Sequence, residues 1–311
     1  MITTEIYKGQ GLGNQLWSIA ACQAIARRCD TNFSILGRER FKGSAFLAPD
    51  FGVSLEGARH RGPCADLPYG ISHYFKERSE LLTQSGRDVT RFDTRVAHIQ
   101  KNTKIDGYFQ SELYLLGLRA SLTKQFRSRF FSPLDDDICV VNFRGGEYRD
   151  LNDVLLPPSY YHSAMEHMQL VRGPLRFMVV TDDRSLARKY FGDIPIVSHR
   201  RVPYIRRIAK TPTSKRIGQD FSLVQAAKNL IISNSSFSWW AAWTNPQNPV
   251  VIAPKYWALH NTSNGFWSQG DSLTSGWQWL DRDGIVWSYE QCQRERESIE
   301  PQYHSEVSEA T

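Results

Sequence analysis

The most constraining feature of the sequence is the segment 231–243, in which an apolar stretch passes through a polar turn into an aromatic run. Its first residues are isoleucines, which favour the end of a buried strand. Four small hydroxyl or amide residues, 233–236, follow. Residues 237–243 are aromatic and alanine-rich and predict a helix with no exposed face. A strand, a polar turn and a buried helix in this order build ligand sites at the carboxyl ends of strands in open α/β sheets.

The polar turn permits two interpretations. Serine and asparagine side chains cap helix N-termini, so the segment can simply be a capped core helix. The free amides of a first helical turn also attract anions, and the aromatic mass beside this turn is typical of a rigid pocket wall. We therefore assign the turn and its neighbours to substrate binding: Asn234, Ser235, Ser236, Phe237 and Ser238.

Length and composition narrow the class of protein. The 311 residues leave room for two domains, and a hydrophobic fraction of 41% with 23% charged residues is typical of a globular protein. No apolar run has the length of a membrane span and the N-terminus lacks the regions of a signal peptide, so we expect a cytoplasmic protein. The five scattered cysteines form no CxxC pair and support neither a disulfide scaffold nor a zinc site. The net charge of +6 indicates an anionic partner, whether a phosphorylated small molecule, nucleic acid or a membrane surface.

A glycine-rich turn, 9–13, lies near the N-terminus between a predicted strand, 2–8, and a predicted helix, 17–29. Such a turn lets backbone amides approach a phosphate or sugar closely, although a tight turn needs glycine for its backbone angles as well. It is neither a P-loop nor a dinucleotide fingerprint, because Asn14 stands where the last glycine of that fingerprint would be. We assign Asn14 and Gln15 to substrate binding.

The middle of the chain contains two residues that are candidates for a sugar-binding cleft, and it also contains the predicted domain linker. Residues 106–114 predict a strand end, a turn and the start of a helix that continues to Phe130. The aromatic residues around Gln110 and Glu112 either line a sugar cleft or pack at a domain interface. We assign Gln110 and Glu112 to substrate binding. A proline followed by three acids, at 133–137, predicts the linker. The predicted domains are therefore 1–134 and 135–290, followed by a polar tail, 291–311, that frays.

Two apolar segments after the linker, 138–143 and 176–181, predict buried strands that end in charged residues. Arg144 follows the first and is succeeded by glycines, which suits bidentate phosphate binding, although a surface turn with an Arg–Glu pair explains it too. Asp182 and Asp183 follow the second and invite a metal-site interpretation. We favour an N-cap pair for the helix 184–191, because a hard divalent ion usually wants phosphates and further oxygen ligands.

The strongest local charge lies between His199 and Gly218, where seven lysines and arginines occur without an acid. This segment is a solvated loop, a phosphate clamp or a patch for anionic lipid. Asp220 begins the next predicted helix and is a candidate for ribose or base recognition. A further strand is expected at 194–198 and another at 250–254. The alternation of strands and helices on both sides of the linker predicts two α/β domains with a cleft between them.

Several segments, taken in order, resemble one enzyme family. They are 9–16, 107–112, 142–147, 180–183 and 220–243, extended by 251–257. Together they resemble the bacterial α-1,2-fucosyltransferases, within the inverting GT-B fucosyltransferases. The resemblance implies two Rossmann-like domains facing across a cleft, of which the C-terminal one binds the sugar nucleotide and the N-terminal one meets the acceptor. It also implies GDP-fucose as donor and no metal or other cofactor.

One segment departs from the family pattern. The family usually has His-x-Arg-Arg-Gly-Asp where this chain has the sequence from Asn142 to Glu147. The first arginine is retained as Arg144, and the second is replaced by Gly145. Arg149 or the basic segment from Arg200 to Arg216 are candidates to replace the missing cation. A relative that uses another GDP-sugar, or a non-catalytic module that binds a sugar nucleotide, remains an alternative.

The predicted reaction transfers fucose to a hydroxyl, the 2-OH, of an oligosaccharide or lipid-linked glycan. Arg144 and the amides and hydroxyls of Ser235 and Ser236 would neutralise the departing diphosphate. As general base we consider Glu147 first, then Asp150 and Glu112. A metal-dependent GT-A-like transferase is the competing enzyme class, and nucleic-acid binding is disfavoured because no recognised module accompanies the basic segment. The predicted catalytic residues are Arg144, Glu147 and Asp150, and the further predicted substrate contacts are Asn142, Asp182 and Asp220.

Overall fold

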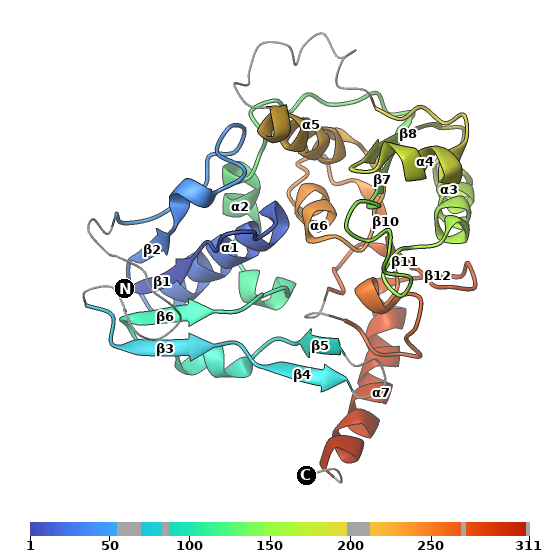
Figure 1. Ribbon diagram of the computed structural model, residues 1–311. Coiled ribbons are helices and arrows are strands. Elements are labelled where there is room, and N and C mark those ends of the chain that lie inside the picture. Colours follow the sequence, from blue (N-terminus) through green and yellow to red (C-terminus); the bar gives the residue numbers. More distant parts are fainter. Residues whose placement is uncertain (55–69, 83–86, 198–211, 269–271, 309–311) are drawn as a thin grey trace.

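The computed structural model describes residues 1–54, 70–82, 87–197, 212–268 and 272–308. They form two α/β units, each with its own sheet (Figure 1). The sheet of the N-terminal unit has the strand order β2-β1-β6-β3, and all its strand pairs are parallel. Its strands are β1 (Ile2–Glu5), β2 (Phe33–Leu36), β3 (His73–Lys76) and β6 (Thr103–Asp106), and a separate hairpin consists of β4 (Ser79–Leu82) and β5 (Arg87–Thr90).

The sheet of the C-terminal unit has the order β12-β11-β10-β9-β7-β8 and is parallel except for β12. Its central strands are almost entirely buried, as expected for a parallel sheet covered on both faces. The prediction of two Rossmann-like units in a GT-B arrangement is therefore confirmed. The strands are β7 (Ile138–Phe143), β8 (Arg176–Thr181), β9 (Asn229–Ile231), β10 (Val250–Pro254), β11 (Gln278–Leu280) and β12 (Val286–Trp287).

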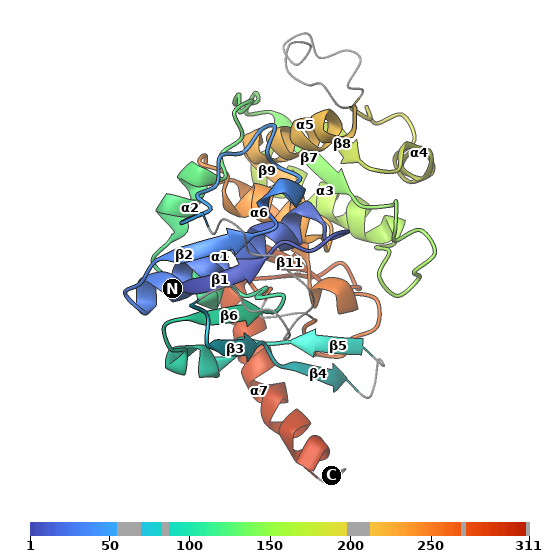
Figure 2. The ribbon, with the colours of Figure 1, turned by 60° about the vertical axis from the view of Figure 1, so that its left-hand side comes forward.

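Helices cover the sheets, and two of them, α1 and α6, pack against each other between the units (Figures 1 and 2). Among the described residues, no helix combines the length and the apolar character that crossing a bilayer requires. The α-helices are α1 (Leu12–Arg28), α2 (Arg119–Gln125), α3 (Pro158–Arg172), α4 (Arg184–Phe191), α5 (Pro212–Ala226), α6 (Ser236–Trp243) and α7 (Tyr289–Ser308). Short 3-10 helices are η1 (Arg38–Arg40), η2 (Thr94–His98), η3 (Glu112–Leu115) and η5 (Trp257–Leu259).

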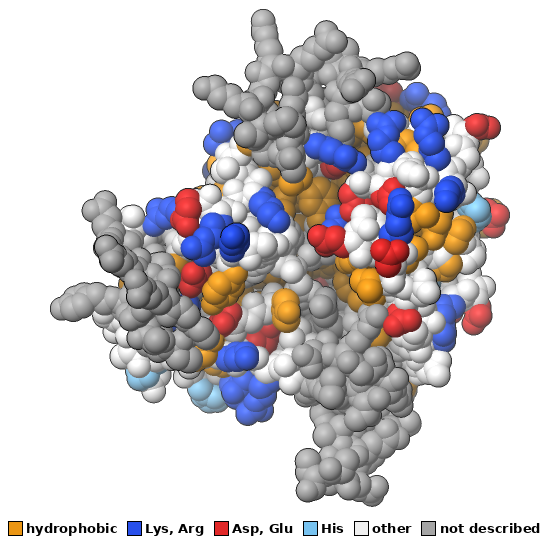
Figure 3. Space-filling model, in the orientation of Figure 1, with side chains coloured by type: hydrophobic (Ala, Val, Ile, Leu, Met, Phe, Trp, Pro, Cys, Tyr) orange, Lys and Arg blue, Asp and Glu red, His pale blue; other side chains and the backbone are white. Residues whose placement is uncertain are grey.

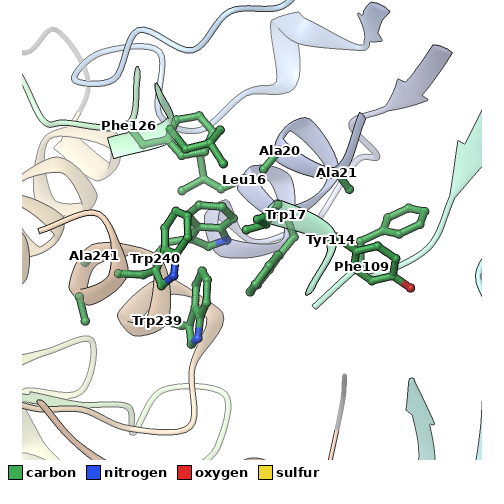
Figure 4. Packing of buried hydrophobic residues seen from close by; sticks show 14 of the residues in the cluster. Leu16, Trp17, Ala20, Ala21, Phe109, Tyr114, Phe126, Trp239, Trp240 and Ala241 are labelled. Carbon is green, nitrogen blue, oxygen red and sulfur yellow. The ribbon is translucent and has the colours of Figure 1, made fainter. Parts of the chain in front are cut away.

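An aromatic cluster joins the two units into one core (Figure 4). The ring of Trp17 in α1 lies 4.2 Å from that of Trp239 and 4.8 Å from that of Trp240 in α6, between ring centroids. Phe126, just after α2, packs edge-on against Trp240 at 5.2 Å. Because all four rings are almost completely buried, the seam between the units is as apolar as a domain interior.

The structure differs from the sequence-based expectation in the middle of the chain. The helix that we expected to continue to Phe130 is divided into η3 and α2. Gly117 lies between them with φ of 77°, a left-handed conformation that interrupts a helix and that glycine adopts without strain. Of the strand expected at 194–198, the described residues 194–197 form a single bridge, between Ile196 and Val179. Asp220 lies inside α5 rather than at the start of its helix.

The structure also differs from the sequence-based expectation at the C-terminal end. A fraying polar tail was expected at 291–311, but residues 289–308 form the helix α7. Cys292 of this helix is completely buried. Glu295 accepts a hydrogen bond from the buried Lys255 Nζ at 2.9 Å and one from Tyr256 Oη at 3.0 Å. These contacts hold the first half of α7 against the C-terminal unit, so the expectation of a frayed tail is wrong for this part of the chain.

Candidate active site

A cavity of ≈ 430 Å³ opens between the two units, where the carboxyl ends of β7 and β8 face the glycine-rich turn of the N-terminal unit. The start of α6 closes its floor, and Arg216 of α5 lines it as well. Figure 3 shows acidic and basic side chains interspersed over the C-terminal unit. A cavity at the carboxyl ends of parallel strands is the position at which α/β proteins bind nucleotides.

The N-termini of two helices meet at this cavity. Gly11 and Leu12 at the start of α1 line it, as do Ser235 and Ser236 at the start of α6. Neither helix has an acid in its first turn, and in the described part of the chain no side chain caps either one. Their free amides and helix dipoles therefore contribute positive potential at the point where the two helices meet, which favours a phosphate group there.

The two helix starts touch directly. A Cβ added to Gly13 would lie 2.4 Å from the backbone carbonyl carbon of Ser236, so only glycine permits this approach. Of the two interpretations of the polar turn, the side-chain cap does not hold, because the N-cap Ser235 makes no side-chain cap bond within the described residues. The next hydroxyls are used elsewhere: Ser236 Oγ donates to Asn14 and Ser238 Oγ donates to Asn142.

Asn14 connects residues from both units. Its Oδ1 accepts hydrogen bonds from Gln110 Nε2 at 2.9 Å and from Ser236 Oγ at 2.8 Å. The amide oxygen takes both bonds, so with respect to the described residues the amide nitrogen is left as a donor for a ligand in the cavity that Asn14 lines. The structure thus brings together three of the predicted substrate-binding residues.

Arg144 lies at the cavity and is held by two acids. It donates to Asp182 through Nη1 and to Glu147 Oε2 through Nη2, the latter at 3.2 Å. Asp182 Oδ1 also accepts the backbone N–H groups of Gly145 and Gly146, at 2.9 and 3.1 Å. The carboxylate therefore fixes both the turn after β7 and the guanidinium that this turn carries.

The glycine that replaces the second arginine of the family pattern has a structural reason. A Cβ at Gly145 would lie 2.8 Å from Asp183 Cβ and 2.8 Å from the ring of Phe143. A Cβ at Gly146 would lie 2.7 Å from Asp182 Oδ2. The turn can approach the aspartates this closely only without side chains, so a larger residue at 145 is excluded by the packing.

The two adjacent aspartates have different partners. Asp183 is the N-cap of α4 and accepts from Leu186 N at 3.0 Å, which confirms the favoured N-cap interpretation. It also binds Arg149, which holds that arginine on the outer side of the turn. Within the described residues, no group of three or more His, Cys, Asp or Glu side chains is placed to hold a metal ion.

Other predicted substrate contacts have mainly internal partners. Asn142 lines the cavity and donates to Val180 O at 3.3 Å, while Asn234 Nδ2 donates to Val154 O at 2.8 Å. Gln15 is buried and bonds to the main chain at Arg40 and Lys42. Phe237 and Asp220 line the cavity, whereas Ser238 is buried beneath it.

The three candidate bases lie in different places. Glu147 lines the cavity, and its side chain is 86% exposed. Asp150 is exposed and is not among the described residues that line the cavity. Glu112 accepts from Trp243 Nε1 at 2.7 Å and borders a separate cavity of ≈ 530 Å³ at the other end of α6. Geometry therefore keeps Glu147 as the first candidate.

The sequence did not point to Glu77, a buried carboxylate that holds the backbone just before Gln110 in the N-terminal unit. Glu77 Oε2 accepts the N–H groups of Tyr108 and Phe109 at 2.7 and 2.8 Å, and Oε1 accepts from Tyr114 Oη at 2.8 Å. Phe109 has φ of 50°, which is strained for this residue. Burial raises the pKa of Glu77 to about 7, against the effect of these donors. No local motif marks Glu77, because its partners are about 30 residues away.

Two cations at the cavity, Lys42 and Arg216, were also not singled out as site residues. Lys42 follows η1 and belongs to no recognisable motif. Arg216 belongs to the basic segment that we proposed as a phosphate clamp. The remainder of that segment, including Arg200, Arg201, Arg206 and Arg207, lies outside the described residues.

Comparisons with known proteins find relatives among glycosyltransferases. The O-antigen biosynthesis glycosyltransferase WbnK of Escherichia coli is 29% identical over 114 residues, which cover 35% of this chain and 34% of WbnK. The α-1,2-colitosyltransferase of Escherichia coli is 27% identical over 281 residues, which cover 82% of this chain and 92% of that protein. The crystal structure of the α-1,6-fucosyltransferase NodZ soaked with GDP-fucose has 16% identity and a TM-score of 0.42, and covers 80% of this chain and 96% of NodZ.

The profile of glycosyl transferase family 11 matches residues 106–280, which is more than half of the chain. The matched range includes the turn after β7, Arg144, both aspartates after β8 and the start of α6. This chain is therefore a glycosyltransferase that belongs to family 11, a family of fucosyltransferase type.

Proposed function

We propose that the protein transfers fucose from GDP-fucose to the 2-hydroxyl of a glycan acceptor, with inversion and without a metal ion. The observation that carries this proposal is the convergence of two uncapped helix N-termini and Arg144 on one cavity. A departing nucleoside diphosphate needs positive charge, and helix N-termini with a guanidinium can supply it. The family membership supports glycosyl transfer as the reaction.

Arg144 would act as the electrostatic catalyst. Its bonds to Asp182 and Glu147 hold the guanidinium before the donor arrives, so little reorganisation is needed as the leaving group develops charge. The amides at the start of α6 and the Asn14 nitrogen would complete the contacts to the diphosphate. Glu147 would take the proton of the acceptor hydroxyl.

In the proposed step the acceptor oxygen forms a bond to the anomeric carbon on the face opposite the diphosphate. The bond between that carbon and the phosphate oxygen breaks, and both of its electrons leave with GDP. The acceptor proton passes to the base. Direct displacement of this kind inverts the anomeric configuration.

A different GDP-sugar is the second candidate for the donor. The relative that matches the largest share of this chain among the curated proteins compared above is named an α-1,2-colitosyltransferase, so its donor sugar is not fucose. Its name also supports the α-1,2 linkage proposed here. Such sugars differ in one or two hydroxyl groups. An apolar pocket discriminates weakly against an added hydroxyl, whereas a site that hydrogen-bonds a hydroxyl strongly rejects a sugar that lacks it.

The test has two measurements. A calorimetric titration with GDP, GDP-fucose, GDP-mannose and UDP in the presence of EDTA measures donor binding, and an assay of GDP release from GDP-fucose measures turnover. Wild type should bind GDP and GDP-fucose without metal. Arg144→Ala should lower turnover by about 10²–10³, the usual cost of losing one such charged donor. Preference for UDP with a metal would exclude the proposal, and donor binding without transfer or slow hydrolysis would favour the non-catalytic module.

We also propose that the enzyme acts in the cytoplasm at the inner membrane face, where lipid-linked acceptors would be available. The basic segment from Arg200 to Arg216 supports this through its charge. Vesicles with anionic lipid should bind wild type and release the variant in which Arg200, Arg201, Arg206 and Arg207 are neutralised. Equal binding of both proteins would exclude the membrane contact.

A further inference from the structure

Arg216 is a cation of the cavity that the proposed transfer step does not yet use, although the basic segment to which it belongs is a candidate to replace the missing arginine. It lies on α5 and lines the same cavity as Arg144, the glycine-rich turn and the start of α6. Arg216 Nη2 donates to Thr181 O at 2.9 Å, at the carboxyl end of β8. Its Nε lies 3.9 Å from Asp220 Oδ2, one helical turn further on. These two contacts orient the guanidinium from the side of the cavity that β8 forms.

The charge of the cavity shows what this guanidinium can add. Arg144 is paired with Asp182 and Glu147, so part of its charge is already compensated. A sugar nucleotide carries two negative charges on its diphosphate, and the diphosphate gains another when the sugar departs. Arg144 and the two helix N-termini therefore leave part of the negative charge of the diphosphate without a cation.

Arg216 has donors left for this task. A guanidinium carries five N–H donors, and in the described part of the chain Arg216 uses them for Thr181 O and the long contact to Asp220. Its side chain is 41% exposed, so a ligand in the cavity can reach it. Arg149, the other candidate for a second cation, is bound to Asp183 and is not among the described residues that line the cavity.

We propose that Arg216 binds the diphosphate of the donor as the second cation, beside Arg144. The inference rests on the proposed function of the cavity and adds a residue from a different element, α5. It also explains how the site manages with glycine at position 145, where an arginine side chain does not fit. Two guanidiniums carried by different elements, the turn after β7 and α5, can each donate to the diphosphate, which fixes its orientation.

The experiment titrates wild type, Arg216→Ala, Arg216→Lys and Arg149→Ala with GDP, inorganic pyrophosphate and guanosine, with EDTA present. Arg216→Ala should bind GDP and pyrophosphate roughly 10- to 100-fold more weakly, the effect of one charge-assisted hydrogen bond, and guanosine as wild type does. Arg216→Lys should recover part of the loss, because a lysine keeps the charge without the fork of donors. Arg149→Ala should bind all three ligands within about twofold of wild type, since it contacts Asp183 instead.

The other outcomes separate the possibilities. Unchanged GDP and pyrophosphate affinity in Arg216→Ala, or an equal loss in Arg149→Ala, would overturn the assignment. Loss of guanosine binding with pyrophosphate binding intact would show that Arg216 recognises the base instead. Failure of wild type to bind GDP and pyrophosphate would refute the proposed function itself, whereas failure of the Arg216 prediction alone would leave that function standing.

Discussion

At the residue scale, the site depends on carboxylates that act through other groups. Asp182 was predicted as a substrate contact, and its position shows a second use. It holds Arg144 and accepts two backbone amides of the turn that carries it. Asp182 is therefore a positioning residue for the cation that is proposed to face the leaving group.

Asp182→Asn should remove the charged partner of Arg144 while keeping the shape of the side chain. We expect turnover to fall by roughly 10- to 100-fold, since a hydrogen bond to a charged group contributes about 1.5–3 kcal/mol. Steady-state kinetics with GDP-fucose would measure it. Asp183→Asn is the matched control: it keeps a side chain that caps α4, loses only the charge that pairs with Arg149, and should change turnover by less than about twofold. Equal turnover losses in both variants would contradict the positioning role.

His260 makes the stability depend on pH. Burial lowers its pKa to about 4 from an ordinary value of 6.5, and the ring is almost completely enclosed. Between these values the unfolded chain binds a proton that the folded chain does not, so stability is complete above about pH 6.5 and is lost as the pH falls toward 4. The loss should reach about 3 kcal/mol. Thermal melts of His260→Gln from pH 7 to 4 should show a flatter profile than wild type, and parallel profiles would refute this.

At the element scale, α7 is held by one buried ion pair. Lys255 is almost completely buried and donates to Glu295 Oε1, and its Nζ lies 3.1 Å from the centre of the Trp287 ring. Glu295→Ala leaves this ammonium without its carboxylate. We expect the free energy of unfolding to fall by about 3–5 kcal/mol, as for other buried charges that lose a partner.

Chemical denaturation measures the effect of Glu295→Ala. Glu297→Ala is its control on the same helix, because that carboxylate is exposed and accepts only from Gln293 Nε2 at 3.1 Å in the described part of the chain. The control should change stability by less than about 0.5 kcal/mol. A similar effect of both variants would show that the lysine does not depend on its partner.

Element prediction succeeded where one local signal was sufficient. The strands 138–143, 176–181 and 250–254 were placed correctly, because short apolar runs that end in charged residues or proline leave few alternatives. The start of α6 was also placed at the cavity. Two other predictions failed. The apolar pattern around Gly117 predicts one continuous helix, but the left-handed backbone of Gly117 interrupts it. The helix α7 was missed because it is held by Lys255, which lies 40 residues before its partner Glu295.

The same reasoning explains which site residues were found. Arg144 stands directly after β7, and Ser236 begins the helix that follows β9, so their position follows from the order of elements. Glu77 and Arg216 reach their places through tertiary contacts to segments about 30 to 35 residues away. A single sequence contains no signal for such contacts.

At the scale of the whole molecule, the two units share their largest buried side chains. Trp240→Ala should lower the free energy of unfolding by about 3–5 kcal/mol and leave one transition, because its ring packs on both Trp17 and Phe126 of the other unit. Within each protein, wild type or variant, tryptophan fluorescence and far-UV circular dichroism should report the same unfolding midpoint as each other. Phe191→Ala, in the smaller cluster of the C-terminal unit alone, is the comparison. Two separate transitions in wild type would contradict a shared core.

The contact between Gly13 and Ser236 has a consequence for how such enzymes can change over evolutionary time. Backbones that touch at this point leave no room for a new partner surface, and the tryptophans beside them must match in shape. Replacing one half of the molecule by that of a relative would therefore bring mismatched seams together. New donor or acceptor preferences in this lineage should arise by substitutions around the rim of the cavity, with the two halves inherited as a pair.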